Sequence, residues 1–132
     1  MNFVGKAGKL GRIGLVGVLV GWAAACGGSG TDAERHGIGA TCGRNENCLE
    51  GLTCLSFKGG YCGLTDCASD LDCPQGSACV EHDDGSNYCF LICTDKPQCN
   101  YGRPVDAESN CSANITFTDP QNGAKACVPP TG

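Results

Sequence analysis

Cysteine and glycine dominate the composition of this chain of 132 residues, numbering 13 and 21. Fourteen acidic residues oppose 9 lysines and arginines, for a formal net charge of −5 at pH 7, and the basic residues do not cluster. This balance argues against nucleic-acid binding, which draws on grouped lysine and arginine, so we expect no nucleic-acid partner.

The first 25 residues have the organisation of a secretory signal peptide. Basic residues at positions 6, 9 and 12 precede an uncharged apolar run, residues 13–25, that is too short to span a bilayer as a stable helix. Three alanines then lead to Cys26, which resembles the lipobox of bacterial lipoproteins, although Ala23 stands where those proteins usually have leucine. Lipobox processing would leave Cys26 as an acylated N-terminus, whereas ordinary signal peptidase would leave it a free thiol.

Cysteine parity favours acylation of Cys26. Setting Cys26 aside leaves twelve of the 13 cysteines, an even set that can pair completely. We therefore predict a signal peptide over residues 1–25, a lipidated cysteine with a flexible linker over 26–39, and a cysteine-rich domain over 40–132. The protein is then expected to be exported and held on the bacterial cell envelope by its lipid. Gly27 after the anchor, in place of aspartate, favours the outer membrane.

Apolar residues are sparse beyond residue 39. Their burial falls short of the roughly 1–2 kcal/mol that ordering the backbone of each residue costs. Six disulfides, each stabilising by roughly 2–4 kcal/mol, would supply the difference in an oxidising compartment. We expect a small disulfide-rich fold of tandem units, each a cystine-stapled loop followed by a short β-hairpin, with little helix.

The twelve cysteines fall into three quartets with a period of about 25 residues. The quartets span residues 42–62, 67–89 and 93–127, and five residues separate the first two cysteines of each. In the first two quartets, asparagine or aspartate precedes the second cysteine and glycine follows it three residues later. The third quartet loosens to intervals of eleven and fifteen residues. Such a period predicts tandem copies of one unit.

Each quartet is predicted to contain one hairpin, because short β-prone runs flank glycine-rich turns. The expected strand pairs are residues 53–57 with 60–63, 78–81 with 87–90, and 112–118 with 124–128.

Residues 67–99 have a regular cysteine pattern: Cys67-x5-Cys73-x5-Cys79-x9-Cys89-x3-Cys93-x5-Cys99, with Asp70-x-Asp72-Cys73-Pro74-x-Gly76 inside it. This pattern resembles the N-terminal cysteine-rich region of the Dickkopf family, and residues 42–62 match it as a variant. The adjacent-cysteine pair of that family is missing from the sequence, and residues 99–127 are too stretched to fit. The resemblance implies the disulfide scaffold and not the signalling activity. Taken whole, the chain is similar to the cysteine-rich lipoproteins of myxobacteria.

Spacing leaves the disulfide pairing open, because doubling a loop changes its closure entropy by only about 0.6 kcal/mol. The Dickkopf resemblance implies that the first cysteine of each quartet pairs with the third and the second with the fourth. The implied disulfides are Cys42–Cys54, Cys48–Cys62, Cys67–Cys79, Cys73–Cys89, Cys93–Cys111 and Cys99–Cys127.

Few side chains are placed for metal binding. Structural zinc sites usually present closely spaced pairs of cysteines, and no such pair recurs here; the three-residue step from Cys89 to Cys93 is the candidate, so we expect disulfides and no metal or other cofactor. His36 falls in the linker and His82 in the run 81–87, which gathers carboxylates, an imidazole and an amide. This run lacks the ligand spacing of a calcium loop, so we predict a solvated hairpin tip. Asn114 begins an N-glycosylation sequon, which we expect to carry nothing in a bacterial chain.

No serine, cysteine or carboxylate is placed as a nucleophile beside a base, so we expect no catalytic residues and no enzyme. The sequence predicts instead a membrane-anchored module that contacts a protein or a glycan. Phe57, Tyr61, Tyr88 and Tyr101 would either lie on exposed tips as contact residues or pack against the disulfides. A small protease inhibitor is the alternative, with residues 57–59 as its reactive loop.

Overall fold

The computed structural model of the chain describes residues 37–132. The predicted signal peptide over residues 1–25, the lipidation site Cys26, His36 and most of the predicted linker lie outside these residues. Within the described part, no helix is both long and apolar enough to cross a membrane.

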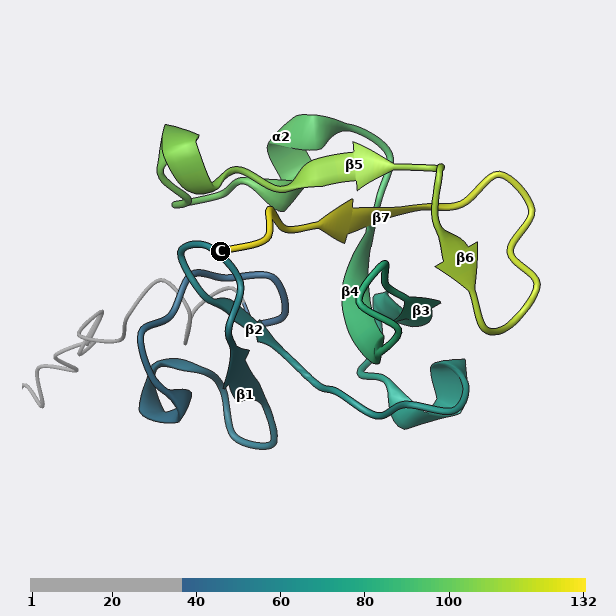
Figure 1. Cartoon of the computed structure of the whole chain (residues 1–132), viewed down its shortest axis with the longest axis horizontal. Helices are drawn as coiled ribbons and strands as arrows, with labels where there is room; N and C mark the ends of the chain where they lie inside the picture. The colour runs from purple at the N-terminus through teal and green to yellow at the C-terminus, as the bar shows by residue number, and fades with distance from the viewer. Residues whose placement is uncertain (1–36) are drawn as a thin grey trace, which may run out of the picture.

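Short strands and helical turns follow one another along the chain (Figure 1). The elements of the described residues are η1 (Asn45–Asn47), β1 (Thr53–Leu55), β2 (Tyr61–Gly63), η2 (Asp70–Asp72), β3 (Ser77–Glu81), β4 (Asn87–Cys93), α2 (Lys96–Cys99), η3 (Val105–Ala107), β5 (Asn110–Ser112), β6 (Thr116–Phe117) and β7 (Lys125–Val128). They form a two-stranded sheet, β1-β2, and a five-stranded sheet in the order β5-β7-β4-β3-β6. The expected fold class, small and disulfide-rich with short hairpins and little helix, is confirmed.

Each cysteine quartet builds one copy of the same unit. A helical turn ends at the second cysteine or just before it, as η1 does before Cys48, η2 before Cys73 and α2 at Cys99. A pair of antiparallel strands follows and sets the third and fourth cysteines directly opposite one another. These opposed residues are Cys54 and Cys62, Cys79 and Cys89, and Cys111 and Cys127. The predicted tandem repeat is therefore present in all three quartets.

Two disulfides hold each unit together, the first cysteine bonded to the third and the second to the fourth. The bonds are Cys42–Cys54, Cys48–Cys62, Cys67–Cys79, Cys73–Cys89, Cys93–Cys111 and Cys99–Cys127. This is the pairing that the Dickkopf resemblance implies. Because the third and fourth cysteines lie on neighbouring strands, the two bonds tie the preceding loop to both strands of a hairpin that would be marginal alone.

A side-chain acceptor just before the second cysteine recurs in every unit. It accepts the backbone N–H of the residue that follows the first cysteine. The donor–acceptor pairs are Gly43 with Asn47 at 3.0 Å, Ala68 with Asp72 at 2.8 Å, and Thr94 with Gln98 at 2.7 Å. The glycines three residues after the second cysteine, at positions 51, 76 and 102, all have positive φ, which other residues adopt at a cost.

The first two hairpins match their prediction. Strands β1 and β2 pair antiparallel, as do β3 and β4. The first hairpin is shorter than expected, because β1 ends at Leu55, and β4 continues to Cys93, where it also pairs with β7.

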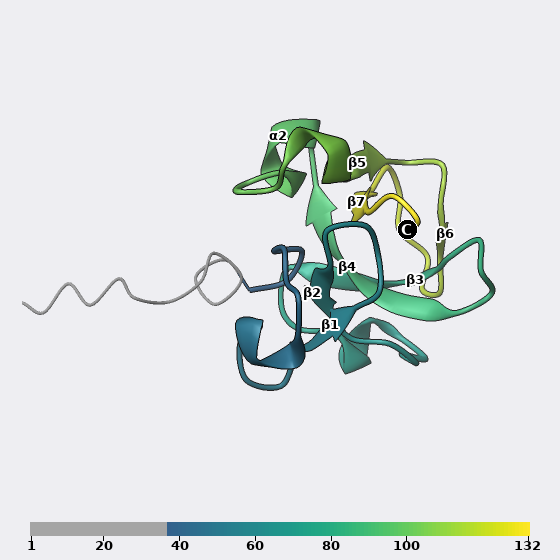
Figure 2. The same cartoon turned by 60° about the vertical axis from the view of Figure 1, so that its left-hand side comes forward.

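The third hairpin departs from its prediction. The single strand expected over residues 112–118 is wrong, because the chain turns between β5 and β6. Strand β5 pairs with β7, whereas β6 crosses to β3 of the second unit (Figure 2). Phe117 thereby lies opposite Val80. There Phe117 packs against the apolar core, a contact that one continuous strand beside β7 would not give it.

One apolar core joins the three units. Its buried members are Leu55, Tyr61, Val80, Phe90 and Ala126. Tyr61 is fully buried, so it is not an exposed contact residue; its hydroxyl donates to the Cys127 carbonyl at 3.2 Å and accepts the Leu91 N–H at 3.0 Å. The three units therefore share an apolar core and are not independent domains.

The folded part of the chain begins before the end of the predicted linker. Residues 37–39 are buried, and Ile38 packs with the cystines of the second unit. The Gly39 N–H donates to the Cys62 carbonyl at 2.8 Å, and the Cys62 N–H donates to the Ala40 carbonyl at 2.9 Å. Residues 37–39 therefore belong to the folded part, because these contacts fix them against β2.

Ionisation of Tyr61 is expected to coincide with alkaline unfolding. Burial raises the pKa of Tyr61 well above the usual value of about 10, outweighing the opposing effects of the Leu91 N–H and Arg103. A group whose pKa is raised by folding contributes its full stability below its unfolded pKa and loses it as the pH rises. Titration of phenolate absorbance, followed together with circular dichroism, should therefore show a late ionisation that accompanies loss of structure. Tyr61→Phe should lack that phase; joint ionisation of all tyrosines in an intact fold would contradict the assignment.

Candidate functional site

The hairpin tip at residues 81–87 holds a buried histidine. Asp83, Asp84 and Gly85 are exposed, as predicted for a solvated turn. The His82 side chain is only 7% exposed, so the prediction that this residue is solvated is wrong. Backbone bonds close the turn above it, with the His82 N–H donating to the Ser86 carbonyl at 2.9 Å.

Three aromatic rings cover the imidazole of His82. The ring centroids of Phe57, Tyr88 and Phe90 lie 5.3, 5.8 and 6.0 Å from that of the imidazole, all edge to face. Such contacts typically add about 0.5–1.5 kcal/mol beyond area burial. Since Phe57 belongs to the first unit, the cluster also fastens the first unit to the second.

Asp84 fixes one edge of the imidazole. Its N–H donates to His82 Nδ1 at 3.4 Å, and one carboxylate oxygen lies 3.5 Å from the same nitrogen. The other oxygen accepts a hydrogen bond from the Tyr88 hydroxyl at 2.7 Å. This bond, together with the one from the Ser86 N–H, lowers the pKa of Asp84. Burial and the Asp84 carboxylate raise the pKa of Tyr88. These contacts hold the imidazole in place.

His82 lies beside a polar cavity. His82 Nε2 has no hydrogen-bond partner among the described residues. Among these residues, the hydroxyl of Ser109 is the only side-chain polar atom that is both unpaired and inaccessible to solvent. Nε2 therefore reaches solvent, and His82 lines a cavity of about 420 Å³. The other polar lining residues are Glu81, Asp83, Asn110, Ser112, Asn114 and Thr116.

The cavity exists because the third unit departs from the repeat. Residues 113–124, between β5 and β7, are far longer than the turns of the other two hairpins, and they carry β6 across to β3. The residues that line the cavity belong to this crossing segment, to β5, to β7 and to the tip of β3. Asn114, the sequon residue, is exposed on its rim.

A second cavity flanks the aromatic cluster. It has a volume of about 510 Å³, and Leu55, Phe57, Thr65, Asp84 and Tyr88 contribute to its walls. Phe57 and Tyr88 are half-buried there and pack against the apolar core. Of the four aromatic side chains considered as contacts, Tyr101 is the most exposed, at 69%.

The loop at residues 57–59 is held on both sides. The Lys58 N–H donates to the Pro130 carbonyl at 3.1 Å, and its carbonyl accepts Arg103 Nη2–H at 2.9 Å. The Lys58 ammonium lies 3.9 Å from the Asp106 carboxylate. A reactive loop must offer free backbone groups to the protease, and those of Lys58 are already used. This geometry counts against the inhibitor reading.

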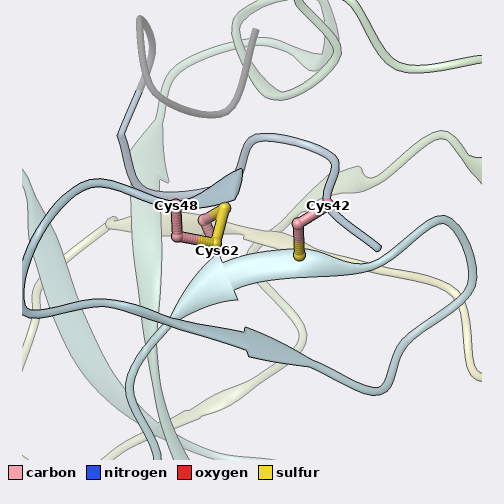
Figure 3. Close-up of side chains that lie close together, drawn as sticks. All are labelled: Cys42, Cys48 and Cys62. Atoms are coloured by element: carbon pink, nitrogen blue, oxygen red, sulfur yellow. A yellow bond between two sulfur atoms is a disulfide. The ribbon is translucent and has the colours of Figure 1, made fainter. Parts of the chain in front are cut away.

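Crossed disulfides bring sulfur atoms together in each unit. The sulfurs of Cys42, Cys48 and Cys62 lie within 4.8 Å of one another, and Figure 3 shows the Cys48–Cys62 bond with Cys42 beside it. Equivalent groups occur in the other two units. Zinc binds thiolates. Each of these sulfurs is instead bonded to another cysteine sulfur, so they lie close together because each unit holds two neighbouring disulfides.

The sequence singled out residues 81–87 for their ligand chemistry, and three of them, Glu81, His82 and Asp83, line this cavity. It gave no sign that Asn110 and Ser112 on β5, or Asn114, would line the same cavity. The long interval between the third and fourth cysteines of the last quartet was the available signal, because it marks the insertion that closes the cavity. Compared with protein-family models, with curated proteins and with solved structures, the chain shows no match to any of them.

Proposed function

We propose that this chain is a non-enzymatic lipoprotein, anchored to the cell envelope through Cys26, that carries a disulfide-rich binding module. One observation carries the proposal. The six disulfides consume every cysteine from Cys42 to Cys127, so Cys26 is the one cysteine of the 13 left for another use. A lipid on that thiol uses it in the manner that the preceding signal-like segment implies, and Gly27 favours the outer membrane.

The arrangement of polar groups favours binding over catalysis. The imidazole of His82 is clamped by rings and by Asp84, and no hydroxyl or thiol among the described residues is hydrogen-bonded to its Nε2 as an activated nucleophile would be. A polar cavity beside a closely packed side chain is suited to holding a ligand. The module would therefore present this cavity outside the cytoplasm.

Replacing Cys26 with serine is expected to release the protein from the envelope. An acyl chain contributes about 0.8 kcal/mol per buried methylene, so its loss removes the anchor without touching the folded module. The measurement is incorporation of an alkyne-labelled fatty acid together with detergent phase partitioning of wild type and Cys26→Ser. Wild type should be labelled and partition with detergent, and Cys26→Ser should do neither. An unlabelled wild-type chain with a free thiol at Cys26 would overturn the proposal; Ser29→Ala serves as a tether control that keeps the label.

A further inference from the structure

We infer that the Cys42–Cys54 disulfide is a thiol-exchange site, at which an external dithiol reduces the first unit, and that the exchange then passes to the neighbouring Cys48–Cys62 bond. The partner belongs to one chemical class, a small molecule or a protein that carries two thiols. The site depends neither on the lipid anchor nor on the binding function proposed above, because it uses only the disulfides of the first unit.

The six disulfides differ in their exposure to solvent. Both cysteines of Cys42–Cys54 are half-buried, whereas each of the other five bonds has at least one buried cysteine. Exchange begins when a thiolate attacks a disulfide sulfur, and its rate depends on access to that sulfur. An external thiol should therefore react first at Cys42–Cys54. The buried cysteines of the other bonds, none more than 7% exposed, are Cys48, Cys62, Cys67, Cys79, Cys89, Cys93, Cys99 and Cys127.

The two cysteines of this bond differ in the space around them. Cys54 lines the second cavity, of about 510 Å³, together with Leu55 and Phe57. Cys42 is not among the residues that line it, and a Cβ placed on Gly60 would lie only 2.8 Å from Cys42 Sγ, so the backbone of β2 packs closely on that sulfur. We therefore expect the incoming thiol to bond Cys54, with Cys42 leaving as the thiolate.

The sulfur of Cys42 has a second disulfide beside it. It lies within 4.8 Å of both sulfurs of Cys48–Cys62 (Figure 3). Once it is released from Cys54, rotation about the Cα–Cβ bond of Cys42 can bring this sulfur to attack either of them. The new bond joins Cys42 to Cys48 or to Cys62, and the displaced cysteine becomes the thiol. Cys48 and Cys62 are themselves buried, so a thiol at either of them reports an exchange that passed through Cys42.

The reaction balances with the dithiol as the only reductant. One of its thiolates attacks Cys54 and forms a mixed disulfide, which releases Cys42 as a thiolate. The second thiol of the partner then attacks the mixed disulfide and releases Cys54, so the partner leaves as a disulfide. The protein has gained two electrons and two protons, carried by two thiols. The later step at Cys48–Cys62 exchanges one thiol for another and consumes no further reductant.

The contacts that remain should hold the fold when this bond opens. The other five disulfides stay closed, and neither Cys42 nor Cys54 belongs to the apolar core shared by the three units. The loop between them also keeps backbone hydrogen bonds at both ends. The Cys42 N–H donates to the Gly59 carbonyl at 3.2 Å, and the Cys54 N–H donates to Asn45 Oδ1 at 2.9 Å. Reduction should therefore open the first unit locally and leave the second and third units folded.

The test is timed reduction of the chain carrying Cys26→Ser, which has no other thiol. Dithiothreitol is added without denaturant at about pH 8, where thiolates are present, and samples are quenched with N-ethylmaleimide and mapped by mass spectrometry. Cys54 should be labelled about tenfold or more faster than any cysteine of the second and third units, because access limits the attack. The second label should be shared among Cys42, Cys48 and Cys62. Near-ultraviolet circular dichroism should show that the species with two labels stays folded.

A variant with Cys48→Ala and Cys62→Ala removes the bond that receives the exchange. Its two labels should fall on Cys42 and Cys54 alone. The matched control carries Cys73→Ala and Cys89→Ala, which removes the corresponding bond of the second unit. It should leave the sharing of label within the first unit unchanged. If either variant fails to fold, the distribution of label in the parent chain still decides the matter.

Two results would overturn the inference. Early labels in the second or third unit, or reduction of all six bonds together, would show that Cys42–Cys54 is not the site of exchange. Labels confined to Cys42 and Cys54 in the parent chain would show that the exchange does not pass to Cys48–Cys62. Neither result bears on acylation of Cys26, which the fatty-acid labelling experiment tests separately.

Discussion

Replacing Arg103 with methionine is expected to lower the free energy of unfolding, with the disulfides intact, by on the order of 3–5 kcal/mol. Arg103 is 7% exposed, and no carboxylate among the described residues pairs with it. Its guanidinium donates instead to four backbone carbonyls. These are Ala107 at 2.8 Å, Gly39 at 3.2 Å, Gly60 at 2.9 Å and Lys58 at 2.9 Å.

The size of the effect follows from where those carbonyls lie. Gly39 belongs to the entering chain, Lys58 and Gly60 to the first hairpin, and Arg103 itself to the loop between α2 and η3 of the third unit. Burial lowers the pKa of Arg103, yet arginine stays ionised at neutral pH. Methionine can fill the space of the side-chain stem, but it leaves four inward-facing carbonyls without a donor, each of which costs about 1–3 kcal/mol when water cannot reach it.

Arg44→Met is the matched control for this prediction. Its side chain is 76% exposed and meets Glu46 at 3.9 Å on the surface, so the same change of charge should alter stability by no more than about 0.5 kcal/mol. Denaturant unfolding followed by near-ultraviolet circular dichroism compares the two variants with wild type. Arg103→Lys should fall between them, because one ammonium cannot span four acceptors. Equal stability of Arg103→Met and Arg44→Met would show that the guanidinium does not join the units.

The structure within each unit could be predicted because it depends on residues that are close together in the sequence. The cysteine spacing marks the loop and the two strands, and the side chains of Asn47 and Asp72 close the loop by accepting an N–H four residues back. Gly51 and Gly76 occupy positive φ at matching positions. Each of these features involves residues close in sequence, so it leaves a repeated pattern that one chain can display.

The contacts between units leave no such pattern in the sequence. Tyr61 reaches Cys127 across 66 positions of the chain, and β6 pairs with β3 rather than with the strand beside it in sequence. Arginine is usually solvated, so composition gave no reason to expect Arg103 inside. The same holds for the cavity: the polar run 81–87 was visible, but burial of His82 depends on Phe57 from another unit. Long-range packing decided all of these, and single-chain patterns do not encode it directly.

Replacing Gly60 with alanine is expected to be the most disruptive single change in the first unit. Gly60 has φ +69°, and a Cβ placed on it would lie 1.9 Å from the Cys42 carbonyl oxygen and 2.8 Å from Cys42 Sγ. Those atoms belong to the backbone and to a disulfide, so they cannot swing aside as a surface side chain would. The entering chain must separate from β2, and with it the Arg103 bonds to Gly39 and Gly60. We expect a loss of at least about 4 kcal/mol and a low yield of the six-disulfide form on oxidative refolding.

Gly123→Ala isolates the steric part of this effect. Gly123 has φ +70°, nearly the value of Gly60, but no atom lies within 4 Å of the position its Cβ would take. The cost of a positive φ alone is about 1 kcal/mol, so Gly123→Ala should refold with all six disulfides and lose little more than that. Mass spectrometry of the refolded species and denaturant unfolding measure both quantities. If the two alanine variants lose the same stability, backbone strain would account for Gly60, and close packing of Cys42 on the first hairpin would not be what holds the entering chain in place.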